Sequence, residues 1–343
     1  MTIVITGGVG FVGSNLIVQL VKTARRDIRI VDNLSVGRLE WLEGALKEVG
    51  EVVRTTGEIP EWRVETGAGV SLIRLFIADV MDLDKACSIS KEATSVIHLA
   101  AQTGVPQSLE IPVRDFEVNA SGTLNYLEAC RQNGIKNFIM ASSAAVLGAG
   151  SSQLTEAGPS RPLSPYGASK AAGEAYCSAY HASYGINSLS LRFSNIYGPH
   201  AWTKGSVVAA FCKRAIEGKP LIINGDGRQT RDFVFIRDLV EIISALVVDT
   251  QAISNCDGFY GQPVNISSGT STAICDLADI MKDMFNDEAV SCSLDTAPFR
   301  VGDVLTSAPK NTRLRTILPG QEFVDLTDGL RETVHWFSHS WKD

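Results

Sequence analysis

The glycine-rich stretch at residues 6–13 constrains the fold more than any other part of this chain. A short apolar, β-branched run at residues 3–5 comes before it and suits a buried parallel strand. The residues after it recur at helical spacing: Val12, Leu16, Ile17, Leu20 and Val21. Strand, glycine turn and helix follow one another in the order of a phosphate-binding unit.

Each glycine of this stretch suits a bound dinucleotide. Gly7 allows a tight turn, Gly10 has no Cβ to keep a pyrophosphate away, and Gly13 lets the helix pack closely on the strand. The free N–H groups and the positive end of the helix dipole would then face the phosphate oxygens. A structural turn that binds nothing is the alternative interpretation.

An acidic residue follows the next strand at the position expected for ribose recognition. The apolar run at residues 28–31 ends in Asp32, about 20 residues after the last glycine. A carboxylate there accepts hydrogen bonds from a 2′-hydroxyl and repels a 2′-phosphate, so the sequence favours NAD over NADP. Arg38 lies close to Asp32 in the sequence and complicates this choice between NAD and NADP.

Length and charge limit the other possibilities. A chain of 343 residues suggests two domains, or one large domain with an added lobe. A net charge of −7 gives no general attraction to nucleic acid or to anionic membranes. No basic leader or apolar run of about 20 residues occurs, so we expect a cytoplasmic protein. Neither the seven cysteines nor the histidines indicate a metal site to us, and we predict no metal.

The doubly wound pattern continues beyond the second strand. Residues 39–70 suggest a helix with an irregular surface excursion, and strands are expected at residues 72–76, 95–99 and 137–140. Because ligands bind at the carboxyl ends of parallel strands, Asp79 and the Ala100-Ala101 turn are candidates for adenine and pyrophosphate contacts. His98 is interpreted as a structural histidine. Apolar spacing predicts a helix at residues 116–133, ended by Gly134.

The candidate chemical centre combines Ser143 with Tyr166 and Lys170. The tyrosine and the lysine are four residues apart and share one face if the segment is helical. An adjacent ammonium and a cationic nicotinamide would lower the phenol pKa from about 10 toward neutrality, which would make Tyr166 a useful base. Ser143, at a strand end, could orient the same substrate hydroxyl.

These motifs resemble the extended short-chain dehydrogenase/reductase family, in its NAD-dependent nucleotide-sugar epimerase/dehydratase branch and closest to UDP-hexose 4-epimerases. The similarity runs nearly end to end. The segments that carry it are residues 7–13, 31–35, 98–102, 142–146, 166–170, 192–199, 225–233 and 300–303.

The resemblance implies an α/β fold, with a Rossmann-like doubly wound parallel sheet, a smaller α/β C-terminal substrate lobe and bound NAD. The implied catalytic residues are Ser143, Tyr166 and Lys170. The implied NAD contacts are Gly7, Gly10, Phe11, Val12, Gly13, Asp32, Asn33, Ser35, Gly37, Asp79, Val80, Leu99, Ala100, Ala101, Gln102, Asn119, Tyr166 and Lys170. The implied contacts to a UDP-sugar substrate are Ser143, Asn195, Ser206, Val207, Val208, Arg231, Arg300 and Asp303.

Two departures from the family pattern bear on the reaction and the substrate. Dehydratases of this branch follow the catalytic Ser/Thr with Asp-Glu, where this chain has Ala144 and Ala145. Many relatives have a tyrosine where this chain has Leu147, and an arginine where it has Gln107. We therefore expect the hexose pocket of this chain to differ from that of those relatives. We therefore predict C4 epimerisation of a UDP-activated hexose or hexuronic acid. A dehydratase or decarboxylase of the family, or a catalytically dead NAD-sensing module, remains the alternative.

The expected domains are interleaved. Residues 1–198 form the NAD-binding domain, to which residues 232–256 return, and residues 199–231 and 257–343 form the nucleotide-sugar lobe. Residues 221–227 suggest a β-hairpin. The resemblance also implies a homodimer, formed through the helices at residues 116–133 and 166–184.

Overall fold

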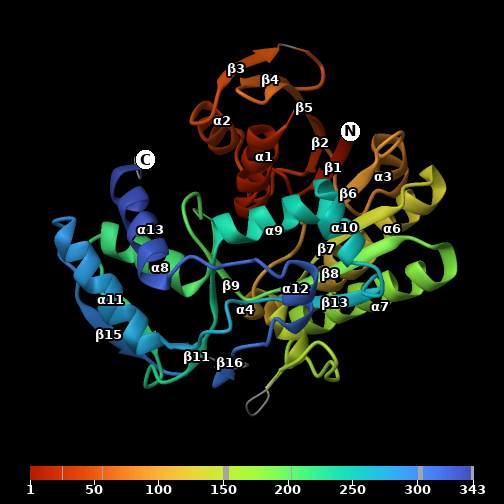
Figure 1. Cartoon of the computed structure of the whole chain (residues 1–343). Helices are drawn as coiled ribbons and strands as arrows, with labels where there is room; N and C mark the ends of the chain where they lie inside the picture. The colour runs from red at the N-terminus through yellow and green to blue at the C-terminus, as the bar shows by residue number, and fades with distance from the viewer. Residues whose placement is uncertain (25, 56, 150–153, 202, 300–303, 341–343) are drawn as a thin grey trace.

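A nine-stranded sheet lies at the centre of the molecule (Figure 1). The computed structural model describes residues 1–24, 26–55, 57–149, 154–201, 203–299 and 304–340. The strand order is β13-β8-β7-β6-β1-β2-β5-β4-β3, parallel from β13 to β5 and antiparallel from β5 to β3. The strands are β1 Thr2–Thr6, β2 Asp27–Asp32, β3 Glu51–Thr55, β4 Glu61–Thr66, β5 Gly69–Ile77, β6 Ser95–His98, β7 Asn137–Ser143, β8 Asn187–Phe193 and β13 Gln262–Ile266.

Helices cover both faces of this sheet. Successive side chains of a central strand therefore alternate between two buried hydrophobic clusters, one on each face. Ile3 and Ile5 of β1 pack with α1 (Phe11–Thr23) and α9 (Ile236–Val248). Val4 packs on the opposite face with α3 (Leu83–Ile89), α6 (Gly122–Asn133) and α7 (Pro165–Tyr184). A strand buried on both faces has to be apolar along its length, as residues 3–5 are.

The chain winds outward from β1 in two directions. It runs through β2 to β5 on one side and through β6, β7 and β8 to β13 on the other. The strand order therefore reverses between β1 and β6, and the carboxyl ends of the parallel strands meet at one edge there. The predicted doubly wound, Rossmann-like parallel sheet is confirmed.

The segment at residues 39–70 is more regular than the sequence suggested. After α2 (Leu39–Lys47), β3 and β4 form an antiparallel pair that extends the sheet from β5. Trp62 and Val64 of β4 are fully buried, whereas the residues between and beside them face outward. The prediction of an irregular excursion was wrong because this alternation of period two is the pattern of a half-buried strand.

A smaller α/β lobe contains the helices α8, α11 and α13, which gather with β15 at one side of the molecule (Figure 1). In this lobe β10 pairs in parallel with the distant β15, so the predicted hairpin at residues 221–227 was wrong. The apolar residues of β10 find their partner far along the chain, although Gly225 and Gly227 do form a turn. The lobe elements are α8 Val207–Ile216, β10 Leu221–Asn224, β11 Thr230–Arg231, β14 Thr272–Ala273, α11 Ile274–Asp287, β15 Leu294–Ala297, β16 Thr306–Ser307, α12 Thr312–Ile317 and α13 Leu326–Ser340.

The predicted domain boundaries stay a prediction, with one difference visible in the sheet. β13 lies within residues 257–343, which we assigned to the lobe, yet it pairs with β8 of the large sheet. β12 pairs with β9 in a separate two-stranded sheet, and α9 packs on α1. Among the described residues, no helix has the length and apolar character needed to cross a membrane. The remaining elements are α4 Val105–Glu110, α5 Pro112–Phe116, the π-helix η1 Glu117–Ser121, the 3-10 helix η2 Ala144–Leu147, β9 Asn195–Tyr197, β12 Phe233–Phe235 and α10 Thr250–Asn255.

Candidate active site

The glycine loop joins β1 to α1 in a shape that needs its glycines. Gly7 has φ +67°, and a Cβ there would lie 2.8 Å from the Ala100 nitrogen. A Cβ at Gly13 would lie 2.6 Å from the Cα of Gly8, so the close packing predicted for this glycine is present. A Cβ at Gly10 would meet, among the described residues beyond its chain neighbours, only the carbonyl oxygen of Gly7, at 3.2 Å. Folding therefore demands Gly7 and Gly13 more strongly than Gly10.

The start of α1, where Phe11 and Val12 lie, fits a negatively charged ligand. Gly10 is the N-cap and supplies no side chain to the first N–H groups of the helix, and the first turn contains no acidic residue. Neither a side-chain cap nor a carboxylate in its own first turn therefore offsets the positive end of this helix dipole. These features fit the pyrophosphate of a dinucleotide.

The carboxylate of Asp32, at the end of β2, is tied to this loop. It accepts hydrogen bonds from the backbone N–H of Val9 at 3.1 Å and of Leu34 at 2.9 Å. Burial raises the pKa of Asp32, and the two hydrogen bonds oppose that rise. Gly37 packs on the loop as well, since a Cβ there would lie 2.6 Å from the Val9 oxygen. The loop and the predicted ribose-binding acid form one unit.

The predicted adenine contacts form a polar group beside β5. Asp79 accepts hydrogen bonds from the Asn33 amide at 3.1 Å and the Met81 N–H at 3.1 Å, and it pairs with Arg114 at 3.2 Å. Burial alone would raise the pKa of Asp79, but these partners together hold it below its usual value. The backbone N–H of Ser35 donates to Asn33. Arg114 was missed because α5 is distant from Asp79 in the sequence.

The turn after β6, residues 99–102, is anchored on both sides. The Ala100 N–H donates to Thr6 Oγ1 at 3.1 Å, and Gln102 exchanges two hydrogen bonds with the side chain of Asn119, at 2.9 and 3.0 Å. Asn119 lies in the π-helix η1, a distortion that recurs at functional sites. Val80 packs closely on Gly122, the residue that follows η1, because a Cβ on Gly122 would lie 2.8 Å from Cγ2 of Val80.

His98 lies beneath this turn in a structural position. It is buried, its Nδ1 lies 2.9 Å from Thr6 Oγ1, and it stacks on Tyr126 and Phe138. Burial, and to a lesser extent the charge of Lys170, lowers the pKa of His98 to about 3. The imidazole is therefore neutral at physiological pH, in agreement with its interpretation as a structural histidine.

The fold brings Ser143 and Tyr166 together. Ser143 ends β7, and its Oγ accepts a hydrogen bond from the Ala145 N–H at 3.1 Å and is hydrogen-bonded to the Tyr166 phenol. Ser164 caps α7 by accepting from the Gly167 N–H, and Pro165 occupies the first turn, so helix formation begins just before Tyr166.

Lys170 lies one turn further along α7. The side chain is 2% exposed, and its Nζ donates to the Ala141 carbonyl at 2.9 Å. The predicted i, i+4 helical placement of Tyr166 and Lys170 is confirmed.

In the protein without its cofactor the pKa of Tyr166 is raised, so the lowering toward neutrality, which included the charge of a bound nicotinamide, stays a prediction. Burial raises the pKa of Tyr166; the hydrogen bond from Ser143 opposes this rise, and the charge of Asp115 adds to it. Burial also lowers the pKa of Lys170 to about 8, against the opposing charges of Asp115 and Glu174. The cost of desolvating the Tyr166 phenolate and the Lys170 ammonium opposes the attraction between these two charged groups.

Four buried polar residues support this centre and were missed from the sequence. Asp115 accepts a hydrogen bond from the hydroxyl of Ser169, which also accepts from the Asn119 amide at 3.0 Å. Glu174 forms a two-point ion pair with Arg192, at 2.7 and 2.8 Å. Glu174 follows Lys170 at the same helical spacing as Lys170 follows Tyr166, a signal that could have found it. Nothing in the local sequence marked Asp115.

The predicted substrate contacts lie on separate elements of the lobe and its junction with the sheet. Asn195 opens β9 and donates to the Asp232 carbonyl at 3.0 Å, and Arg231 lies in β11. Ser206 is the N-cap of α8, with Val207 and Val208 in its first turn. Arg300 and Asp303 lie outside the described residues.

A cavity of about 480 Å³ lies beside two of the predicted substrate contacts, because Thr272, which lines it, pairs with Arg231, and Phe233, which also lines it, pairs with Asn195. The rest of its lining comes from the segment after β13, from α12 and from residues 321–326, and includes Ser268, Arg315 and Asp325. None of Ser143, Tyr166 or Lys170 lines it. The candidate active site is therefore defined by the side chains of Ser143, Tyr166 and Lys170 and not by this cavity.

The doubly wound sheet and the glycine loop fit an NAD-dependent enzyme, with Ser143 at the end of β7 and Tyr166 and Lys170 on α7 as its candidate reactive groups. The chain belongs to the NAD-dependent epimerase/dehydratase family, whose sequence profile matches residues 3–266. NAD is its cofactor.

The chain is similar over nearly its whole length to other members of this family. It is 30% identical to the putative UDP-glucose 4-epimerase of Methanocaldococcus jannaschii, over 98% of this chain and 99% of the relative. It is 31% identical to the UDP-glucose 4-epimerase of Mycolicibacterium smegmatis, over 98% of both chains. The structure of the Thermus thermophilus UDP-glucose 4-epimerase in complex with NAD superposes with a TM-score of 0.81, at 30% identity, covering 99% of this chain and 100% of that one.

Proposed function

We propose that this protein inverts the configuration at C4 of a UDP-activated hexose or hexuronic acid, through a transient 4-keto sugar. The observation that carries the proposal is the pairing of Ser143 with Tyr166, one helical turn from the buried Lys170. In the sequence, Ala144 and Ala145 directly follow Ser143. The site contains the groups needed to move one proton at a hydroxyl. At the two alanines it lacks the acid and base that removal of water requires.

The residues divide the work at C4. Tyr166, as phenolate, takes the proton of the C4 hydroxyl and later returns it, and Ser143 holds that hydroxyl by a hydrogen bond. Lys170, one helical turn away and fixed to the Ala141 carbonyl, supplies a positive charge that favours the phenolate. Bound NAD supplies the acceptor, and then the donor, of the C4 hydride.

Inversion requires the sugar to turn while the nucleotide stays bound. Asn195, Ser206 and Arg231 are the described candidates for holding the nucleotide and its diphosphate, with Arg300 and Asp303 implied by the family resemblance. Arginines suit this role because they donate charge-assisted hydrogen bonds to a dianion in a protein of net charge −7. With binding strength located there, the hexose can present either face to the same reaction centre.

The alternatives make different demands on the site. A dehydratase or decarboxylase shares the oxidation step but needs acid–base groups beyond Ser143 and Tyr166. A catalytically dead NAD-sensing module has no need for the tyrosine and lysine. The described side chains favour the epimerase on both counts.

The deciding experiment follows the fate of the C4 hydrogen. The protein is incubated in deuterated water with UDP-glucose, UDP-N-acetylglucosamine and UDP-glucuronate in turn, and the products are followed by NMR. We expect a C4 epimer of at least one sugar that keeps its original C4 hydrogen. Loss of water, loss of carbon dioxide or solvent deuterium at C4 would refute the mechanism, and no turnover of any sugar would favour the binding module.

We further propose that the protein is a homodimer whose interface includes α5, η1, α6 and α7. Large apolar side chains on and beside α4, α5 and α7 are exposed. They are Leu109, Ile111, Val113, Phe116, Tyr176 and Tyr184, and Val113 is 69% exposed. Because α5 packs on α7, two of these helices lie side by side and form a surface that a second copy could cover.

A further inference from the structure

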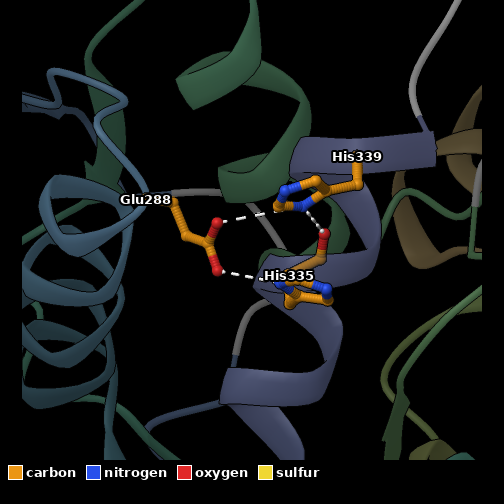
Figure 2. A group of neighbouring side chains, drawn as sticks. All are labelled: Glu288, His335 and His339. Carbon is orange, nitrogen blue, oxygen red and sulfur yellow. Dashed lines mark hydrogen bonds and ion pairs between the residues drawn. The ribbon is translucent and has the colours of Figure 1, made fainter.

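Two histidines and a glutamate, none of them among the candidate active-site residues, meet at the surface of the lobe (Figure 2). His335 and His339 lie one turn apart on α13, and Glu288 is the C-cap of α11. Their potential ligand atoms all lie within 4.8 Å of one another. Our sequence-based prediction of no metal overlooked this His-x-x-x-His spacing, which places two imidazoles on one helix face.

The geometry is close to that of a metal-binding triad. The glutamate carboxylate lies between the two rings, with one oxygen 3.0 Å from His335 Nδ1 and the other 3.8 Å from His339 Nδ1 (Figure 2). A tetrahedral zinc ion with bonds of about 2.0 Å holds its ligand atoms roughly 3.3 Å apart. Rotation of the three side chains, with His339 binding through Nε2, would bring the ligand atoms to that separation.

One ring is already held as metal-binding histidines usually are. His339 Nδ1 lies 2.9 Å from the His335 carbonyl oxygen. A carbonyl only accepts, so Nδ1 carries the proton and the lone pair is on Nε2. A hydrogen bond of this kind fixes the tautomer and orientation of a metal-binding imidazole.

The backbone beneath the triad is also fixed. Leu330, Val334 and Phe337 of α13 pack in the same buried core as Met281 and Phe285 of α11. Ligand binding would therefore order side chains only and would not require the helices to move. A site on such a rigid support loses less entropy on binding.

We propose that Glu288, His335 and His339 form a site for a divalent transition metal, of which zinc is the best match, that cross-links α13 to the end of α11. Two imidazoles and one carboxylate suit zinc and its neighbours in the first transition row. Calcium and magnesium prefer oxygen ligands throughout. The fourth position, open to solvent, would hold water. The metal would stabilise the lobe through the C-terminal helix and take no part in the reaction at C4.

Metal binding is tested by calorimetry on the whole protein, made without a histidine tag and treated with a chelator. We expect one zinc ion to bind per chain and magnesium to give no signal. Glu288→Gln, His335→Gln and His339→Gln should each weaken zinc binding by at least about tenfold. Glu332→Gln removes a carboxylate from the same helix outside the triad, and Cys292→Ser removes a thiol of the lobe; both should bind zinc as the parent does.

Thermal unfolding gives an independent readout. Zinc should raise the melting temperature of the parent and of the two control variants, and leave that of the triad variants unchanged. Circular dichroism without metal checks that all variants fold. Zinc binding that is absent, or is retained unchanged in folded His335→Gln and His339→Gln, would overturn the proposal. Loss of binding in Cys292→Ser with retention in Glu288→Gln would overturn it too, because that result places the metal on other ligands.

Discussion

Tyr166 is the residue on which the proposed reaction depends most directly. Its phenol is hydrogen-bonded to Ser143 and partly buried, so the ring can keep its place when the hydroxyl is removed. We expect Tyr166→Phe to lower kcat by about 10²–10⁴-fold while bound NAD and the melting temperature stay near those of the parent. Steady-state kinetics and the nicotinamide content of the purified variant measure both effects.

The matched control lies on the same helix. Tyr176 is 41% exposed, and Tyr176→Phe makes the same chemical change on α7 away from Ser143. It should keep full activity. Equal losses in the two variants, or full activity in Tyr166→Phe, would remove Tyr166 from the mechanism.

The buried ammonium of Lys170 makes stability depend on pH. Burial lowers its pKa in the folded, cofactor-free protein to about 8, against an ordinary value of 10.5 in the unfolded chain. Below pH 8 both states carry the charge, and the folded state bears the full cost of burying it. Between pH 8 and 10.5 the unfolded chain binds more protons, so this contribution to the free energy of unfolding becomes more favourable as pH rises.

Comparison with Lys170→Met isolates that effect. The free energy of unfolding of the parent minus that of the variant should rise by about 3 kcal/mol across this pH range. Denaturant titrations of the chelated, cofactor-free proteins at several pH values measure it. A difference that stays constant or falls with pH would contradict the buried, desolvated lysine.

At the residue scale, sequence patterns located the groups but not their environment. Tyr166 and Lys170 were found because four-residue spacing is visible in one helix. Asp115, which raises the pKa of Tyr166, was not found because α5 meets α7 only in the folded protein. The net direction of a pKa shift depends on such contacts and on burial, and neither is written in a local motif.

At the scale of elements, the glycine loop predicts two kinds of variant. A Cβ at Gly10 would make one tight contact, 3.2 Å from the Gly7 oxygen, which is milder than the clash at Gly13, and it would face the proposed pyrophosphate position; Gly10→Val should therefore fold and bind NAD more weakly by about tenfold or more. Gly13→Ala would push a methyl group against Gly8 and should destabilise the fold itself by about 1–3 kcal/mol. Nicotinamide content and melting temperature distinguish the two.

Gly44→Ala provides the control for adding a methyl group. It lies in α2 with no heavy atom near the added Cβ, and alanine is the better helix former, so stability should hold or increase slightly. NAD loss that matched in Gly10→Val and Gly44→Ala would show that the loop has no special role.

Elements were predictable where the pattern is local and were missed where the partner is distant. The β1 strand and α1 follow from residues 3–21 alone. The pairing of β10 with β15 joins segments separated by most of the lobe, and a nearby glycine turn suggested a hairpin in its place. Turn residues permit a reversal of the chain, but side-chain packing decides which strands pair.

At the scale of the whole molecule, the proposed dimer predicts a change of mass. Val113→Lys combined with Phe116→Glu places charges on the exposed apolar surface of α5. We expect the parent to sediment as a dimer at micromolar concentration and the double variant as a monomer. Val53→Lys, which charges another exposed apolar position on β3, should remain dimeric. A monomeric parent would refute the interface.

The β3–β4 pair has a consequence for solubility. It makes β3 the outermost strand of the large sheet, with one row of backbone N–H and C=O groups available to template another chain. At the other end of the sheet α12 packs on β13. β3 is short, and its exposed side chains include Glu51 and Arg54, charges that disfavour stacking of one molecule on the next. Replacing both with valine should make this edge strand a site of self-association. Light scattering should then increase with protein concentration while NAD binding persists.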